Sequence, residues 1–349
     1  MSLITITDVA KAAGVSTATV SRVLHNKAVK PHTKEAVMNA IKELNYKPNA
    51  LAQQLRTQKT KTVIVVVPDI SNTFFSEILF GIEDAAREHD YQILIADMHN
   101  QPNIEDYYFQ AIQQRTIDGI ISLSATIAKN LMEQIAEEYP IVVACQYLDN
   151  YMVPNVTIDN ISAATAITEH LIQLGHTRIA HIAGDPNSLL YRDRFNGYIA
   201  ALAKHNIPID LSLVRYGVSS IQSGYDEMKY LLNQDPSISA VFAAGDIIAV
   251  GAINALKESG KRVPEDCAVV GFDDIEIASF WEPPLTTVRQ PRRKLGQTAF
   301  RKLYKLMNQH PLKSVQDVLD YEIMIRESCG YNQNLNRKNN TTKEIDYEM

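Results

Sequence analysis

The hydrophobic pattern at the start of the chain predicts three short helices. Apolar residues recur three or four positions apart over residues 5–14, 17–24 and 33–45, which is the spacing of helices that bury one face. The first two helices are joined by a tight turn, as in a helix-turn-helix. The third stripe supplies the apolar face that a three-helix unit needs to bury.

Residues with strong capping preferences mark the ends of these helices. Thr5 and Asp8 have the spacing of a capping box, and the carboxylate also suits the positive end of the helix dipole. Gly14 can take the left-handed conformation that ends a helix, and Ser16 is expected to cap the second helix. Thr33 is expected to cap the third.

From residue 62 onward, short apolar runs alternate with amphipathic helical stretches. This alternation predicts mostly parallel sheets that are covered by helices on both faces. Strands are expected at residues 63–67, 93–96, 119–123, 141–145, 179–183, 214–216, 240–244 and 268–272. Helices are expected at residues 75–88, 104–114, 162–174, 194–205, 224–232 and 248–258.

The predicted fold class is a helical head followed by an α/β body of two doubly wound lobes. Ligands of such sheets bind beyond the carboxyl ends of the strands, so a cleft lining is expected there. The predicted parts are a helix-turn-helix domain (1–47), a hinge helix and linker (48–61), a two-lobe domain (62–330) and a disordered tail (331–349).

Charge is distributed unevenly along the chain. Residues 1–60 hold nine Lys/Arg and three Asp/Glu, a net of +6; since the whole chain carries −6, the remaining 289 of 349 residues carry −12. A basic head on an acidic body is expected where only the head meets phosphate. Residues 49–55 favour a helix that is marginal in water and would order only against a partner.

Composition excludes several classes of protein. No apolar stretch approaches the roughly 18 to 20 residues of a membrane span, and no signal-peptide layout is present, so we expect a cytoplasmic protein. Cys145, Cys267 and Cys329 are too widely spaced to predict a disulfide framework or a zinc site. Because glycine-rich nucleotide motifs are also missing, no cofactor, metal or enzymatic activity is expected.

The motifs together resemble the lactose/galactose repressor family of bacterial transcription regulators. The resemblance covers residues 5–328 and implies a body of periplasmic-binding-protein type. It is carried by DVAKAAGVSTATVSRVL, YKPNALAQQL, PDISNTFFSEILFGIE, HLIQLGHTRIAHIAG, RFNGY, VPEDCAVVGFDD and PPLTTVRQP. Within the family, PDISNTFFSEI and RDRFNGY are most similar to the cytidine and ribose repressors.

The second helix has a polar face of short side chains that fits the DNA major groove. The alternative is an ordinary helical hairpin with a solvated face. The resemblance implies a homodimer whose heads bind the half-sites of a near-palindromic operator. It implies base contacts from Thr17, Ala18 and Arg22, and phosphate or groove-wall contacts from Ser16, Thr19, Ser21 and Asn26. In the hinge it implies that Leu55 wedges into the minor groove, with Ala52 on the same face.

The resemblance also implies a small polyhydroxy effector, which would be a nucleoside, purine or sugar, in the cleft between the lobes. The residues that it assigns to the effector are Phe74, Phe75, Gln146, Arg194, Ser219 and Asp273. Aromatic walls would cover the apolar ring face of the effector, and charged groups would bind its hydroxyl edges.

For the two charged residues, Arg194 and Asp273, the sequence allows a structural role instead of a contact to the effector. Arg194 could pair with Asp193 or Glu169 at the surface, because exposed ion pairs are common and weak. Asp273 could cap a turn and leave Asp274 at the cleft.

The aromatic pair also has an alternative. Phe74 and Phe75 could be core residues, although a tandem pair after a strand would normally bury only one ring. Nearby in the predicted cleft, Asp246 is expected to be the N-cap of the next helix rather than a ligand contact.

Two cleft positions leave the size of the effector open. Ser219 stands where members of the family often have a bulky aromatic residue, and Gly245 stands where many have an asparagine. Either the pocket admits a larger effector such as a nucleoside, or Trp281 or Tyr191 fills the space.

The sequence therefore predicts a DNA-binding transcriptional repressor whose operator affinity depends on the effector. The alternative is a cytosolic sugar- or nucleoside-binding protein without specific DNA recognition. The basic head argues against that alternative.

Overall fold

The computed structural model describes residues 4–24, 27–47, 59–98, 114, 116–123, 139–147 and 153–331. The chain forms two compact units, Met1–Thr60 and Lys61–Met349. The whole of the predicted hinge helix (49–55), with Ala52 and Leu55, lies outside the described residues. The same is true of Asn26, of the tail beyond residue 331, and of the helix predicted at 104–114 except for its last residue.

The head is built from helices α1 (Ile6–Ala12), α2 (Thr17–Leu24) and α3 (Pro31–Glu43). Each helix contributes one fully buried valine to a shared core, namely Val9, Val20 and Val37. The apolar stripes therefore meet as the sequence predicts, and the second helix has the predicted bounds.

Both predicted features at the ends of α1 are confirmed. The Asp8 carboxylate accepts hydrogen bonds from the Thr5 backbone N–H at 2.8 Å and from the Thr5 hydroxyl at 2.7 Å. Gly14 has a φ of 66°, the left-handed conformation that ends a helix without strain at glycine.

The predicted start of α3 is wrong. The helix begins at Pro31 with Lys30 as its N-cap, so Thr33 lies inside the first turn and does not cap the helix. Proline is favoured at the first helical position because its fixed φ is already helical and its missing N–H needs no partner there.

The first lobe of the body contains, among the described residues, a six-stranded parallel sheet in the order β11-β5-β4-β3-β1-β2. Its strands are β1 (Thr62–Val67), β2 (Gln92–Asp97), β3 (Gly119–Ser122), β4 (Ile141–Ala144), β5 (Asn155–Ile158) and β11 (Gln316–Leu319). Helices α5 (Phe74–Arg87) and α13 (Arg292–Met307) share the core of one face with Val63, Val65 and Val67 of β1.

Helices α5 and α13 cross at two glycines. A Cβ atom on Gly81 would overlap the carbonyl oxygen of Arg293, and one on Gly296 would overlap that of Ile78. The helix backbones can approach this closely only because both positions lack a side chain.

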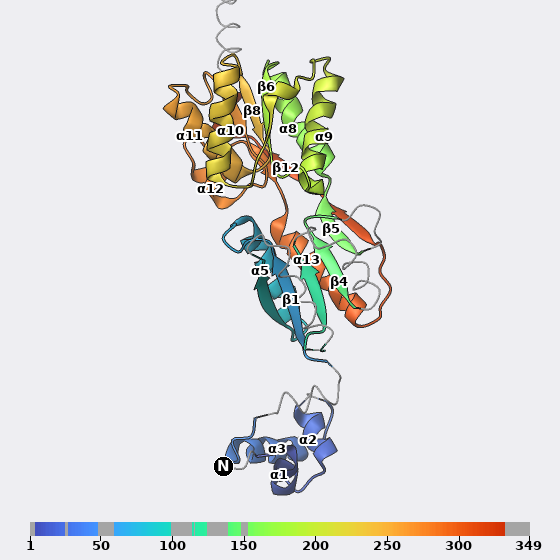
Figure 1. The fold of residues 1–349 in the computed structure, drawn as a ribbon. Coiled ribbons are helices and arrows are strands. Elements are labelled where there is room, and N and C mark those ends of the chain that lie inside the picture. The colour runs from blue at the N-terminus through green and yellow to red at the C-terminus, as the bar shows by residue number, and fades with distance from the viewer. Residues whose placement is uncertain are drawn as a thin grey trace, which may run out of the picture. The chain divides into compact units, whose positions relative to one another are not determined.

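The second lobe contains a parallel sheet in the order β7-β6-β8-β9. Its strands are β6 (Ile179–Ala183), β7 (Val214–Tyr216), β8 (Ala240–Ala243) and β9 (Ala268–Val270). Helices α8 (Asn160–Gln173) and α9 (Leu189–Lys204) cover one face, and α10 (Ile221–Gln234) and α11 (Asp246–Glu258) cover the other (Figure 1). The predicted architecture of two doubly wound lobes is therefore confirmed.

The segment after β9 carries elements that the apolar pattern did not predict. They are α12 (Glu276–Phe280), β10 (Thr287–Arg289), α13, β11, β12 (Glu322–Met324) and the short 3₁₀ helix Glu327–Cys329. Strands β10 and β12 pair antiparallel, and the chain between them runs through α13 and β11 of the first lobe. A further 3₁₀ turn, Leu211–Leu213, precedes β7.

The core of the second lobe contains a neutral histidine. His181 of β6 is fully buried; its Nδ1 donates to the Phe242 carbonyl at 2.8 Å, and its ring stacks on Phe242 and Tyr198. Burial lowers its pKa from 6.5 to about 4. Protonation therefore favours the unfolded chain.

We expect Gly81→Ala to lower the free energy of unfolding by about 1–3 kcal/mol, because the methyl group forces α5 and α13 apart. Urea unfolding followed by circular dichroism measures this change. The control is Glu83→Ala, which removes an exposed ion pair from the same helix and should cost less than about 0.5 kcal/mol. Equal losses in the two variants would show that the crossing is not tight.

We expect His181 to make the protein less stable as pH falls from about 6.5 to about 4, by up to about 1.4 kcal/mol per pH unit. The native state binds fewer protons than the unfolded state in this window, so stability rises with pH. In unfolding experiments across the window, His181→Gln should flatten the profile, whereas the exposed His310→Gln should not. A profile that keeps its slope in His181→Gln would contradict this assignment.

Candidate functional site

Helix α2 presents a polar face in the head. Val20 and Val23 are buried, whereas Ser16, Thr17, Ala18 and Arg22 are exposed and Thr19 and Ser21 are half-buried. All the described residues that the sequence assigned to DNA contacts are thus at least partly accessible.

The N-terminus of α2 is held by its predicted cap. The Ser16 hydroxyl oxygen accepts from the Thr19 backbone N–H at 3.2 Å, and the two hydroxyls lie 3.0 Å apart. This hydrogen bonding fixes the start of the helix, where short side chains and free backbone N–H groups can approach a phosphate or a base edge.

In the body, Arg194 is a buried cation and not a surface one. It is 2% exposed, and its guanidinium stacks on the Phe272 ring at 3.7 Å. It donates to Asn160 Oδ1 at 3.2 Å, to the carbonyl oxygen of Ala244, and to Asp273 Oδ1 at 3.1 Å. The alternative pairing with Asp193 or Glu169 is therefore wrong. Two residues that the sequence assigned separately to the effector are directly bonded.

Asp273 lies in the loop after β9 in an unusual backbone conformation. Its φ is 114°, and its side chain is 18% exposed. Oδ1 also accepts from Gln290 Nε2 at 2.7 Å. Burial raises the pKa of Asp273, and Arg194 opposes that rise. The pair places a cation and a carboxylate side by side, the groups that bind the hydroxyls of a sugar.

The two tandem aromatic residues are both buried, contrary to the expectation that one ring would be exposed. Phe74 and Phe75 are each 8% exposed and meet edge to face at 5.2 Å. The two rings are the first residues of α5, and both belong to one apolar cluster with the buried residues of β1 and α13. Their apolar cluster includes Cys145 and Ile275. Ile275 lies two residues after Asp273, so the cluster extends to the polar pair.

The segment that follows β4 in the first lobe makes a hydrogen bond to the second lobe. Gln146 is half-buried, and the next residue, Tyr147, donates from its hydroxyl to Asp193 Oδ2 at 2.7 Å. Asp193 belongs to α9 and precedes Arg194. Sequence reasoning did not single out Tyr147, although it lies next to a predicted contact.

The structure shows whether a neighbouring side chain fills the space at the two positions with small residues, Ser219 and Gly245. Ser219 is exposed, and its hydroxyl lies close to that of Tyr191. Trp281 instead packs against the apolar core between the sheet and helices α10 and α11. A Cβ atom on Gly245 would meet only Asp273 Oδ2, at 3.5 Å. Tyr191 therefore occupies the space at Ser219, whereas the space at Gly245 is open.

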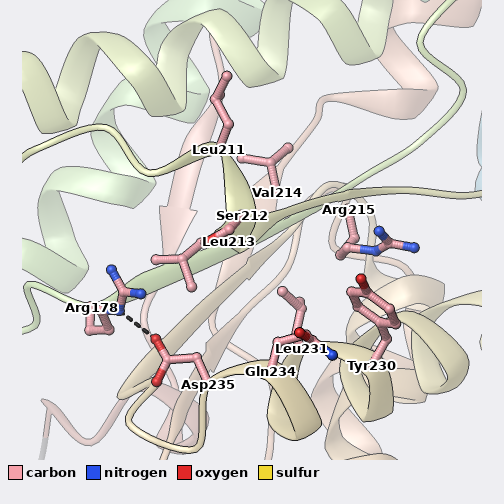
Figure 2. A pocket seen from close by; sticks show the side chains of 10 residues that line it. All are labelled: Arg178, Leu211, Ser212, Leu213, Val214, Arg215, Tyr230, Leu231, Gln234 and Asp235. Atoms are coloured by element: carbon pink, nitrogen blue, oxygen red, sulfur yellow. Dashed lines mark hydrogen bonds and ion pairs between the residues drawn. The ribbon is translucent and has the colours of Figure 1, made fainter.

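Two hollows lie apart from these residues. One of about 320 Å³ lies beside β7 and α10 (Figure 2), but its Arg178 is paired with Asp210 and Asp235, and its Arg215 with Glu227. The other, of about 730 Å³, lies between the first half of α5 and the segment 289–294. Gln290 lines this second hollow and also bonds Asp273, so it connects the hollow to the candidate site.

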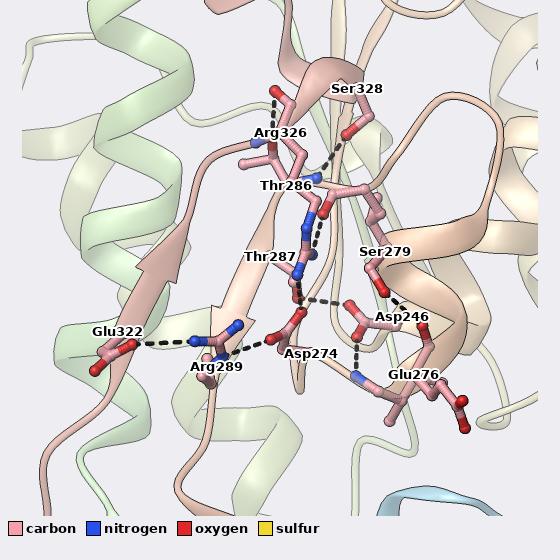
Figure 3. A network of polar contacts seen from close by, with 12 residues as sticks. Asp246, Asp274, Glu276, Ser279, Thr286, Thr287, Arg289, Glu322, Arg326 and Ser328 are labelled. Atoms are coloured by element: carbon pink, nitrogen blue, oxygen red, sulfur yellow. Dashed lines mark hydrogen bonds and ion pairs between the residues drawn. The ribbon is translucent and has the colours of Figure 1, made fainter.

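A polar network fastens the loop that carries Asp273 (Figure 3). Asp246 accepts from Thr287 Oγ1 at 2.6 Å and from the Ile275 backbone N–H at 2.8 Å. It is the first residue of α11 and Gly245 is the N-cap, so the predicted capping role of Asp246 is wrong. Burial, together with the nearby Asp273 carboxylate, raises its pKa well above the ordinary value.

Asp274 joins three chain segments in the same network. Its carboxylate accepts from Arg289 Nε at 2.7 Å and from Arg326 Nη2 at 2.6 Å, and it is buried. Asp274 follows β9, Arg289 is the last residue of β10, and Arg326 follows β12. The alternative that Asp274 replaces Asp273 at the cleft is not supported, because both oxygens of Asp274 are already bonded.

The described residues include no group of three or more His, Cys, Asp or Glu side chains placed to hold a metal ion. Among the helices of these residues, none combines the length and the apolar character that crossing a bilayer requires.

Comparison with known proteins gives a consistent picture over most of the chain. Residues 5–49 match the model of bacterial regulatory proteins of the LacI family, and residues 60–320 match that of periplasmic binding proteins and the sugar-binding domain of the LacI family. The HTH-type transcriptional regulator RegA of Clostridium saccharobutylicum is 39% identical over 93% of this chain and 98% of its own length. The HTH-type transcriptional repressor CytR of Escherichia coli K12 is 36% identical over 93% and 96%.

Solved structures agree. A lac repressor dimer bound to operator and the anti-inducer ONPF is 30% identical and covers 94% of this chain and 99% of its own, with a TM-score of 0.83. A complex of the transcriptional regulator CelR with cellobiose is 35% identical over 93% and 99%, with a TM-score of 0.73. The chain therefore belongs to the LacI family of bacterial regulatory proteins and is a transcriptional regulator with a helix-turn-helix head and an effector-binding body.

Proposed function

We propose that the chain represses transcription as a homodimer, with each head on one half-site of a near-palindromic operator. A nucleoside, purine or sugar effector binds beside Arg194 and Asp273 and changes the affinity for DNA. The protein acts in the cytoplasm, where the operator lies. The observation that carries the proposal is the buried Arg194–Asp273 pair, a polar site already built in a chain that also has an exposed α2.

The relatives support the dimer on operator DNA and the sugar effector. The lac repressor structure is a dimer on operator DNA, and the CelR structure holds a sugar. The head of this chain carries a net charge of +6 and leaves Thr17, Ala18 and Arg22 exposed, as base contacts require. Ser16, Thr19 and Ser21 lie beside them and suit phosphate contacts.

The body supplies the control. An effector that binds one arrangement of the lobes better than another changes the affinity for DNA. The coupling free energy between the two sites is typically about 1–3 kcal/mol, which corresponds to a change in affinity of about 5- to 150-fold. The bond from Tyr147 to Asp193 joins the lobes next to Arg194, so lobe arrangement and effector binding share neighbouring residues.

We expect Arg22→Ala to lose base discrimination of about 1–3 kcal/mol at one operator position, because a long cation in the groove reads a single base pair. The operator is obtained by selection from random DNA, and binding to each single-base variant is measured by fluorescence anisotropy. The matched control is Lys59→Ala, which should weaken binding to all sequences alike. An equal loss on every sequence in Arg22→Ala would contradict base reading by Arg22.

We expect Asp273→Asn to weaken effector binding at least about tenfold, since a charged acceptor contributes about 1.5–3 kcal/mol to a hydrogen bond. The asparagine keeps the size of the side chain and an acceptor for Arg194. The measurement is the rise in Tm with cytidine, adenosine, D-ribose, D-glucose and cellobiose. Tm rises because a bound ligand increases the free energy of unfolding by RT ln(1 + [L]/Kd).

The control for this experiment is Asp266→Asn, which changes an exposed carboxylate that is paired with Arg262 in the same lobe. It should leave the ligand-induced rise in Tm as in wild type. If Asp273→Asn also kept the full rise, Asp273 would have no part in the effector site.

A further inference from the structure

An aromatic ring lies at the carboxyl end of β6, next to the buried cation. Tyr191 comes from the first turn of α9, three residues before Arg194. The Arg194 guanidinium lies 5.8 Å from the centre of its ring. Tyr191 is half-buried, so it is not wholly taken up by the core.

Two small residues hold this ring in place. Gly184 directly follows β6, and a Cβ atom there would overlap the Tyr191 ring. The Ser219 hydroxyl lies close to the Tyr191 hydroxyl at the far end of the ring. A larger residue at either position would displace the tyrosine, so Gly184, Ser219 and Tyr191 are mutually adapted.

The early start of α9 makes this arrangement possible. The helix begins at Leu189, whereas the sequence pattern predicts a start at 194. The extra turn places Tyr191 and Arg194 on the same side of the helix, because residues three apart are neighbours on its surface. Both are thus directed to the end of the sheet where ligands of doubly wound folds bind.

The opposite side of the polar pair is open. Gly245 leaves space beside Asp273 Oδ2, with no other atom within 4 Å of a Cβ built there. A ligand ring whose hydroxyls reach Arg194 and Asp273 can thus extend over Gly245, whereas the ring of Tyr191 bounds it near Ser219.

We propose that Tyr191 is the aromatic wall of the effector site and packs against the flat face of a ring in a polyhydroxy effector. Members of the family often have an aromatic residue at the position of Ser219. In this chain the small residues Ser219 and Gly184 leave room for an aromatic ring that comes from α9 instead. This inference rests on the proposed function, because it assumes that the effector binds beside Arg194 and Asp273.

The ring that packs on Tyr191 has two chemical sources. It is either the sugar ring itself, through its C–H groups, or the base of a nucleoside, through stacking of the two π systems. Both place an apolar face on tyrosine while hydroxyls face the charged pair. Stacking on an aromatic side chain typically contributes a factor of about 5 to 150 in affinity.

The test is calorimetric titration of the full-length protein with cytidine, adenosine and D-ribose. The variants are Tyr191→Ala, Tyr191→Phe and the double variant Tyr191→Ala/Ser219→Phe, with Tyr191→Leu as a volume-preserving substitute if the alanine variant unfolds. Thermal unfolding without ligand checks that each variant is folded.

We expect Tyr191→Ala or Tyr191→Leu to weaken binding about 5- to 150-fold. Tyr191→Phe should retain most of the affinity, because the ring remains. The double variant should recover binding relative to Tyr191→Ala, since it restores an aromatic ring from position 219. Loss confined to the nucleosides assigns the ring on Tyr191 to the base, and an equal loss for D-ribose assigns it to the sugar.

Wild-type affinity in folded Tyr191→Ala or Tyr191→Leu overturns the proposal. If Asp273→Asn abolishes binding of the same probe in that case, the proposed effector site stands and only the wall is wrong. If neither variant changes binding, or if wild type binds neither these three probes nor D-glucose or cellobiose, the effector site and its wall are both wrong. DNA binding by the head is measured separately and is not affected by these outcomes.

Discussion

The second lobe depends on burying one guanidinium group with its hydrogen bonds satisfied. A buried charge without partners costs several kcal/mol, so Arg194 requires acceptors at fixed positions. They come from Asn160 at the start of α8, from Ala244 after β8, and from Asp273 after β9. One side chain of α9 therefore fixes the ends of three other elements. The same requirement holds Asp273 in a backbone conformation that few residues other than glycine adopt.

This constraint builds the proposed effector site before any effector binds. Within the described part of the chain, three of the five N–H groups of Arg194 have acceptors, so the rest can bind hydroxyls without the side chain having to be ordered first. Asp246 and Asp274 hold the part of the loop that directly follows Asp273. A site of this kind selects by geometry, and changes of side-chain size around it, as at Gly245, alter which ligand fits.

The first lobe is tied to this site through the chain itself. Gln290 bonds Asp273 and lies two residues before α13, whose backbone packs closely on α5 at Gly81 and Gly296. Phe74 and Phe75 begin α5 and share an apolar cluster with Ile275. A shift of the Asp273 loop therefore displaces α5 and α13 of the first lobe, because close-packed interiors transmit displacement. This is the physical connection that control of a DNA-binding head by an effector requires.

The sequence by itself determined the local structure wherever one short segment contains the whole signal. The Thr5–Asp8 pairing, the stop at Gly14 and the apolar runs of β1, β6 and β8 need only neighbouring residues, and the family motifs are equally local. Only the tertiary structure decided which charged groups meet. Arg194 and Asp273 are 79 positions apart, and the pairing of Asp246 with Thr287 spans 41. It also decided that β5 and β11 are neighbours, because their polar sequences become strands only beside a partner. Likewise, the space at Ser219 is filled from α9, since which side chain reaches a position depends on packing and not on order along the chain.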